Sequence, residues 1–96
     1  MLLLEWAERA QQDLLSIHRF IARDNSATAN VWVKKLRERV RQACDNPLAG
    51  RIVPELGQAD IREVLLKNYR IVYRVKSDTL VVLTVFEGHR LLRNEN

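Results

Sequence analysis

The hydrophobic rhythm of the sequence changes once, at Pro47, and this change favours a fold in which helices precede most of the strands. Before Pro47, small and apolar residues recur at spacings of three and four, the pattern of amphipathic helices. After it, β-branched and aromatic residues gather in three short segments with hairpin-length connections. We therefore expect an α+β fold, with a helical hairpin followed by a three-stranded antiparallel meander.

The two helices are expected near residues 8–23 and 27–45. Their apolar stripes are Ala7, Ala10, Leu14, Ile17 and Ile21, then Ala29, Val33, Leu36, Val40 and Ala43. Between them, Asp24-Asn25-Ser26 supplies turn residues and an N-cap for the second helix. The second helix should stop before Pro47, because a proline disfavours helical geometry in the residue that precedes it.

The expected sheet has four strands and is covered by the helix pair on one face. The apolar residues 2–6 suit an edge strand ahead of the hairpin. The meander strands are expected at Ile61–Leu66, Tyr69–Val75 and 79–86. Gly50, Pro54 and Gly57 indicate a loop before them.

Length and composition limit the choices further. A chain of 96 residues suits one domain, residues 1–96. The net charge of +4 favours nucleic acid, an acidic protein or an anionic surface as a partner, without selecting among them. The single cysteine, Cys44, has no metal-ligand cluster near it, so we expect neither a metal nor a cofactor. With no signal-peptide core and no apolar run long enough to span a membrane, we expect a cytoplasmic protein.

Alternation along the middle meander strand suggests a candidate site. Arg70, Val72 and Arg74 should lie on one face, and Tyr69, Ile71, Tyr73 and Val75 on the other. Two arginines on the same face can bind an anion. The alternative has no binding role: Arg70 and Arg74 are solvated, or they pair with Glu63 across the strands.

Other prominent residues favour packing or solvent exposure. We interpret Trp6, Trp32 and Cys44 as core residues, and His18 as structural or exposed. The basic run in residues 34–41 spreads over the polar arc of a helix, which is typical of a solvated face. Its alternative is contact with an acidic partner or nucleic acid.

An ordered set of motifs resembles the RelE/ParE toxin superfamily. The motifs are residues 50–55, 61–63, 68–75 and 85–90, together with Trp6, Ala10, Asp13, Leu14 and Ile17 in the first helix. This resemblance implies a growth-inhibiting toxin that is neutralised by a separately encoded antitoxin. RelE-like members cut messenger RNA in the ribosomal A site, whereas ParE-like members poison DNA gyrase.

The resemblance also implies site residues. Arg70 matches a sheet arginine that helps to stabilise phosphate in the RNA-cutting members, and Arg62 lies on the neighbouring strand. Where relatives often carry a histidine, just before Gly88, this chain has Glu87, and His89 follows two residues later. Metal-free RNA cleavage needs a base, an acid and cations. The candidates for such a nuclease are Arg62, Arg70, Arg74, Glu87 and His89.

The last strand suggests an antitoxin surface. Alternation puts Leu80, Val82 and Phe86 on one side, and Val81, Leu83 and Val85 on the other. Two helices can bury only one sheet face, so we expect an acidic and apolar antitoxin segment to wrap the toxin in a hetero-oligomer. The residues expected to contact the antitoxin or the target are Arg62, Arg70, Arg74, Leu80, Val82, Phe86 and Arg90.

Three functions follow from these observations. We favour a toxin that binds and poisons DNA gyrase, because the negative charge of Glu87 would oppose a phosphate. The alternative is a ribosome-dependent endoribonuclease of messenger RNA that uses the arginines and His89. A third hypothesis, independent of the family, is a small basic domain whose binding to nucleic acid depends strongly on salt.

Overall fold

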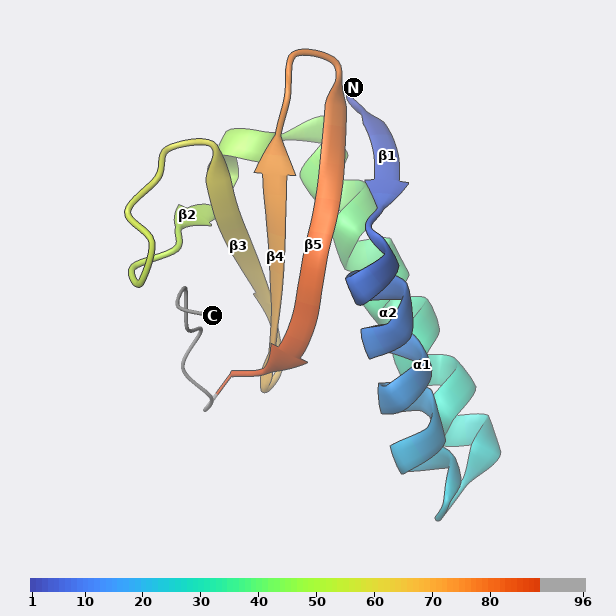
Figure 1. Ribbon diagram of the computed structural model, residues 1–96. Coiled ribbons are helices and arrows are strands. Elements are labelled where there is room, and N and C mark those ends of the chain that lie inside the picture. Colours follow the sequence, from blue (N-terminus) through green and yellow to red (C-terminus); the bar gives the residue numbers. More distant parts are fainter. Residues whose placement is uncertain (89–96) are drawn as a thin grey trace.

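A computed structural model describes residues 1–88 and confirms the α+β fold (Figure 1). The elements in chain order are β1 (Leu3–Trp6), α1 (Glu8–Ala22), α2 (Ser26–Asp45), the 3-10 helix η1 (Pro47–Ala49), β2 (Arg51–Ile52), β3 (Ile61–Leu66), β4 (Tyr69–Val75) and β5 (Thr79–Glu87). Within this part of the chain, no helix is long and apolar enough to cross a bilayer.

The sheet has five strands in the order β1-β5-β4-β3-β2. Strands β3, β4 and β5 form the predicted antiparallel meander, and β1 pairs with β5 in parallel. The fifth strand, β2, lies in the segment predicted to be a loop and pairs with β3 through Arg51 and Ile52. A two-residue strand is too short to show alternation, which is why the sequence pattern did not reveal it.

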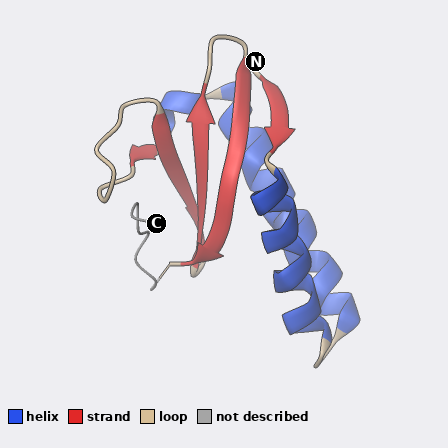
Figure 2. Ribbon diagram, viewed as in Figure 1, coloured by secondary structure: helices blue, strands red, loops and turns tan. Residues whose placement is uncertain are grey.

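An N-cap residue and a following proline determine where helix α2 begins and ends. The side chain of Asn25 accepts a hydrogen bond of 3.0 Å from the backbone N–H of Thr28, which confirms the predicted N-cap of α2. Helix α2 ends at Asp45, two residues before Pro47. Figure 2 shows α1 and α2 side by side along one flank of the sheet, with the tip of the hairpin extending beyond the strands.

The main core lies between the hairpin and the sheet. Its buried residues are Ala10, Leu14, Leu36, Val40, Ala43, Cys44, Val64, Tyr69, Ile71, Tyr73, Leu80, Val82 and Val85. Trp6 and Trp32 are half-buried at its margin, so their predicted packing role is confirmed, as is that of Cys44. Burial of this kind stabilises by about 25 cal/mol per Å² of apolar surface, which makes the cluster the main support of the fold.

A second, smaller core covers part of the opposite sheet face. Val53, Ile61 and Val72 are buried there, and Leu56, Leu83 and Phe86 pack against them. Val53 and Leu56 come from the chain between β2 and β3, so this connection covers the strands from the side that the helices leave open. The chain thus supplies from within part of the cover that the sequence interpretation assigned to an antitoxin.

A β-bulge changes the predicted faces of β5. Val72 pairs with Thr84, but the next residue, Tyr73, pairs with Val82, so β5 carries one extra residue at Leu83. Beyond this point the alternation is reversed, and Val85 joins the main core while Phe86 joins the second one. The prediction that Phe86 shares a face with Val82 is therefore wrong, because it assumed an uninterrupted period of two.

The helices make polar contacts with two strands of the sheet at positions where no neighbouring strand is paired. On β1, the N–H of Leu2 donates to the carbonyl of Cys44 at 3.2 Å, and the side chain of Gln11 donates to the carbonyl of Trp6 at 3.1 Å. On β3, the side chain of Arg39 donates to the carbonyl of Leu65 at 3.3 Å. In each case a helix supplies the group that meets the strand edge.

Candidate functional site

The side chain of Arg70 lies on the sheet face that alternation predicted, and it is buried. Its guanidinium contacts two carboxylates. Its Nε donates to Oε1 of Glu63 at 2.7 Å. Nη1 and Nη2 donate to the two carboxylate oxygens of Glu55 at 2.8 and 2.9 Å. The alternative of pairing with Glu63 holds for Arg70 but not for Arg74, and Glu55 is a partner that the sequence did not indicate.

Glu63 connects Arg70 to a second arginine. Glu63 has no exposed side-chain surface, and its second partner is the guanidinium of Arg51. Among the residues that the structure describes, two arginines thus meet two glutamates. The hydrogen bond with Glu55 raises the pKa of Arg70 above its ordinary value, burial works in the opposite direction, and Glu63 adds to the increase.

The ring of Phe86 also lies beside Arg70. The guanidinium carbon of Arg70 lies 5.1 Å from the centre of the Phe86 ring, a cation–π arrangement. Phe86 stands opposite Arg70 in the β4–β5 register, so the two side chains share one sheet face. The site of Arg70 therefore has an apolar wall as well as acidic partners.

Arg62 lies away from this network. Arg62 is paired with Tyr73 in the β3–β4 register, and the Tyr73 ring lies in the main core. The side chain of Arg62 therefore lies on the helix-covered face of the sheet, opposite to the face that carries Arg70. Its Nη1 donates to the carbonyls of Leu48 and Gly50 at 3.2 and 3.1 Å, and its Nε donates to the carbonyl of Ala59 at 3.1 Å. Arg62 thus holds the chain on either side of β2.

Arg74 lies on the same face as Arg70, as predicted. Its Nε is 3.4 Å from Oδ2 of Asp60, and both side chains are about half exposed. The backbone N–H of Val75 also donates to the carbonyl of Asp60 at 2.8 Å. All three candidate arginines therefore contact residues 47–60, the segment that we call the covering segment, and each helps to fix it on the sheet.

The two sides of the sheet separate the proposed nuclease residues. Glu87 pairs in register with Tyr69, a residue of the main core, whereas Phe86 pairs with Arg70. Burial, and then the charge of Glu87, raise the pKa of Tyr69. His89 and Arg90 lie outside the described residues. Within residues 1–88, then, Glu87 and Arg70 do not share a face.

Most of the apolar residues expected to contact a partner are inside the protein. Leu80 and Val82 have no exposed surface, because α1 and α2 cover their side of β5. Their assignment to a binding surface is corrected here, since they are core residues. Phe86 keeps some exposure beside Arg70.

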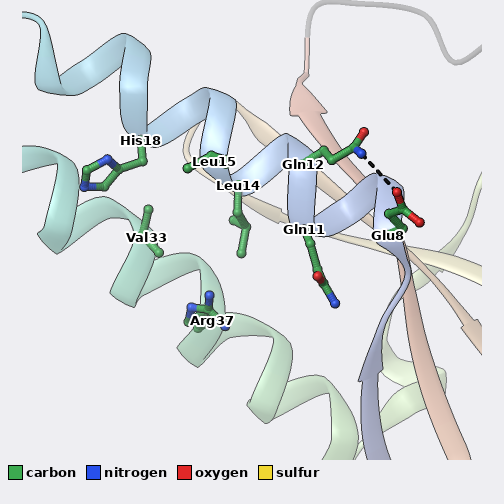
Figure 3. Close-up of a pocket in the computed structure, with 8 residues that line it drawn as sticks. All are labelled: Glu8, Gln11, Gln12, Leu14, Leu15, His18, Val33 and Arg37. Atoms are coloured by element: carbon green, nitrogen blue, oxygen red, sulfur yellow. Dashed lines mark hydrogen bonds between the residues drawn. The ribbon is translucent and has the colours of Figure 1, made fainter.

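A groove on the helical hairpin was not indicated by the sequence interpretation (Figure 3). It has a volume of about 880 Å³ and is lined by Glu8, Gln11, Gln12, Leu14, Leu15, His18, Val33 and Arg37. Leu15 is half exposed there. Nε2 of His18 forms a hydrogen bond of 2.8 Å with Oδ1 of Asn30, across the hairpin. The signal in the sequence was Leu15 itself, an apolar residue outside the buried stripe of its helix.

Two cations of the basic run in α2 are directed to aromatic rings. The ammonium of Lys35 lies 5.4 Å from the centre of the Trp32 ring, and the guanidinium of Arg37 lies 5.5 Å from that of Trp6. Among the residues that the structure describes, no group of three or more His, Cys, Asp or Glu is placed to hold a metal ion.

Comparisons with known proteins agree with this architecture. The chromosomal ParDE TA system from P. aeruginosa contains a similar chain, with a TM-score of 0.75, 21% identity, and coverage of 91% of this chain and 96% of that one. The solution structure of a conserved hypothetical protein from Helicobacter pylori gives a TM-score of 0.58 at 20% identity, with 96% and 100% coverage. At these identities the two likenesses show the fold.

No curated protein sequence matches the chain. The family model described as "ParE toxin of type II toxin-antitoxin system, parDE" matches residues 4–92, which is nearly the whole length and includes the hairpin, the covering segment and the meander. The chain therefore belongs to the family of ParE toxins of type II toxin-antitoxin systems.

Proposed function

We propose that this toxin inhibits growth by binding and poisoning DNA gyrase, and not by cutting messenger RNA. The observation that carries the proposal is the state of Arg70, whose guanidinium is already bound by Glu55 and Glu63. A phosphate that approached this residue would have to displace a carboxylate. A toxin that binds a protein needs no such cation, only a complementary surface.

The distribution of the remaining groups supports the same choice. Cleavage of RNA without a metal needs an acid or base beside the cation that stabilises phosphate. Glu87 pairs with Tyr69 on the helix side of the sheet, so it does not meet Arg70. Loss of a positioned acid or base typically lowers a rate by about 10² to 10⁴. An arginine that is itself neutralised cannot compensate for a loss of that size.

We also propose that a cognate antitoxin binds this chain, because the similar chain from P. aeruginosa is part of a ParDE TA system. The net charge of +4 favours an acidic partner. Exposed apolar residues, among them Leu3, Leu15 and Phe20, favour one that also carries apolar side chains. Of the contact residues expected from the sequence, Arg62, Arg74 and Phe86 keep exposed surface and remain in this proposal.

The test is a brief induction of the toxin in growing cells, with two readouts taken from the same culture. We expect inhibited supercoiling by gyrase and a DNA-damage response, with no new cuts in messenger RNA. Purified toxin should inhibit supercoiling by purified gyrase, and the inhibition should be relieved by the product of the neighbouring gene. Codon-phased cuts in messenger RNA together with normal supercoiling would show that the proposal is wrong.

A further inference from the structure

The covering segment leaves one part of the sheet face opposite the helices open. It lies at the β2 and β3 side of the sheet, away from β1 (Figure 1). On the open part, Val81 and Leu83 of β5 both keep exposed surface, and 67% of Leu3 on β1 is exposed. Leu83 packs against the second core, so it marks the border between the covered and the open parts. Neighbouring apolar side chains on an uncovered surface favour contact with a protein.

Three residues form a row across this open part. Val81 pairs in register with Glu5 of β1 on one side and with Arg74 of β4 on the other. Residues paired in this way share a sheet face. The face is the one opposite the helices, because Leu80, which precedes Val81, is buried in the main core. An acidic, an apolar and a basic side chain thus follow one another at the spacing of adjacent strands, about 4.8 Å.

Both charged groups of this row can accept a further partner. Glu5 is exposed and forms no ion pair within residues 1–88. Arg74 has 41% of its side chain exposed, and its Nε lies 3.4 Å from Oδ2 of Asp60. In the part of the chain that the structure describes, that Nε makes no hydrogen bond. A carboxylate placed above Arg74 would therefore add a contact without replacing one.

The row is complementary to a second copy of itself. A rotation of 180° about an axis parallel to β5 places the partner's Arg74 opposite Glu5, and the partner's Glu5 opposite Arg74. The Val81 side chains of the two copies then meet on the axis. In the strand order β1-β5-β4-β3-β2, only β1 lies on one side of β5. The rotation therefore carries β2, β3 and the covering segment of each copy beyond β1 of the other, outside the contact.

We propose that the free toxin forms a symmetric dimer through the open part of this face, with Glu5 of each copy paired to the partner's Arg74. The contact is restricted to β1, β5 and the near side of β4, and interfaces below ~1,200 Å² in total are typical of weak complexes. We therefore expect a dissociation constant on the order of micromolar. Because Arg74 is also assigned to the antitoxin, the dimer belongs to the toxin without its antitoxin, and it is independent of the action on gyrase.

The first experiment is sedimentation velocity of the full chain, made by cell-free synthesis, over a range of concentrations. We expect the mass to rise from one chain to two as the concentration increases. High salt should weaken the association, because it screens exposed ion pairs.

Charge reversal tests which residues meet. Glu5→Arg places like charges opposite each other at two positions of the dimer, so we expect the dissociation constant to increase by at least about tenfold. Addition of Arg74→Glu restores opposite charges in the reverse order and should recover the association. Asp24→Arg changes the net charge by the same amount at the exposed tip of the hairpin and should leave the dissociation constant unchanged.

A cross-link provides a second measurement that does not depend on charge. Sheets packed face to face lie about 10 Å apart, so a bismaleimide of similar length should join two copies of Val81→Cys. Ser26→Cys, at the exposed start of α2, is the control and should give few dimers. The native Cys44 is buried, so it should react little in either protein.

Each of the opposite outcomes overturns the proposal, once circular dichroism has shown that the variants are folded. A chain that stays monomeric at all concentrations would leave this face to another protein, such as the antitoxin. A dimer that tolerates Glu5→Arg, or that Asp24→Arg weakens equally, would not use the Glu5–Arg74 pair. Failure of the folded double variant to associate, or equal cross-linking of Val81→Cys and Ser26→Cys, would exclude the symmetric arrangement about Val81.

Discussion

The hydroxyl of Tyr73 donates a hydrogen bond of 2.6 Å to the carbonyl of Pro47, and this contact joins β4 to the point where the helical half of the chain ends. Tyr73 is almost fully buried, so the hydroxyl and the carbonyl would each be costly to leave unpaired. The contact thus links the two halves whose hydrophobic periods differ.

Tyr73→Phe should destabilise the protein. The substitution leaves the carbonyl of Pro47 without this donor in a part-buried position, at an expected cost of about 1 to 3 kcal/mol in the free energy of unfolding. Urea denaturation followed by circular dichroism measures the change. Tyr69→Phe, in the same strand, is the control and should cost less. Equal losses in the two variants would contradict the role given to the Tyr73 hydroxyl.

The alkaline stability of the protein should depend on Tyr73. Burial raises the pKa of Tyr73 above its usual value near 10, so its neutral form stabilises the folded state. This contribution is complete below the pKa of the unfolded chain and is lost as the pH rises toward the folded pKa. The stability difference between wild type and Tyr73→Phe should therefore narrow above pH about 10, by up to about 1.4 kcal/mol per pH unit. A stability difference between the two proteins that stays constant to high pH would argue against the raised pKa of Tyr73.

Gly50→Ala should be more harmful than an ordinary glycine substitution in a loop. A Cβ at this position would overlap the Tyr73 hydroxyl oxygen and lie 2.9 Å from the backbone oxygen of Glu63. We expect a loss of about 1 to 3 kcal/mol, the usual range for overpacking. In a double-mutant cycle, Tyr73→Phe should relieve part of this loss, because it removes the overlapping atom. Strict additivity of the two losses would rule out this steric explanation.

Asp13 should stabilise the end of β5. Its Oδ2 accepts hydrogen bonds from the side chain of Thr84 at 2.5 Å and from the backbone N–H of Val85 at 3.0 Å, next to the β-bulge. Asp13→Ala would leave a part-buried N–H without this acceptor, and we expect a cost of about 1 to 3 kcal/mol. Hydrogen exchange at Val85 should become faster in this variant. Asp24→Ala, at the exposed tip of the hairpin, should leave that rate unchanged.

Glu87→Gln should leave growth inhibition unchanged to within a few-fold. The reason is that a gyrase-binding toxin needs no acid or base, whereas a nuclease that used Glu87 would lose about 10² to 10⁴ in rate. Growth after induction, corrected for the toxin level on an immunoblot, provides the measurement. A loss of toxicity at equal levels of folded protein would restore Glu87 as a catalytic candidate.

The structural features that the sequence predicted correctly depend on residues that are close together in the chain. Periodicity identified both helices and all three meander strands, and the local capping chemistry of Asn25 placed the start of α2. It also predicted that Arg70 and Arg74 leave the same face. These features follow from the spacing of residues within one element, which a single sequence displays directly.

The sequence did not predict what depends on distant contacts. Glu55 meets Arg70 across 15 positions of the chain, through a turn whose path no periodicity describes. The β-bulge at Leu83 reverses which residues of β5 lie on each face. A pattern of strict alternation does not predict the position of such an extra residue. Arg62, which resemblance grouped with Arg70, binds backbone carbonyls on the other side of the sheet. The sequence therefore indicated that Arg70 and Arg74 share a face, but not which residues each of them contacts.

The polar contacts between the helices and the unpaired positions of β1 and β3 have a consequence for association between copies of the chain. Gln11 and Arg39 reach from the helices to the carbonyls of Trp6 and Leu65, so an incoming strand would have to break these bonds before it could pair. Each carbonyl bound in this way is one fewer acceptor for the strand-by-strand stacking that leads to fibrils. Helix side chains that occupy these carbonyls therefore act against the addition of a strand from a second copy of the chain.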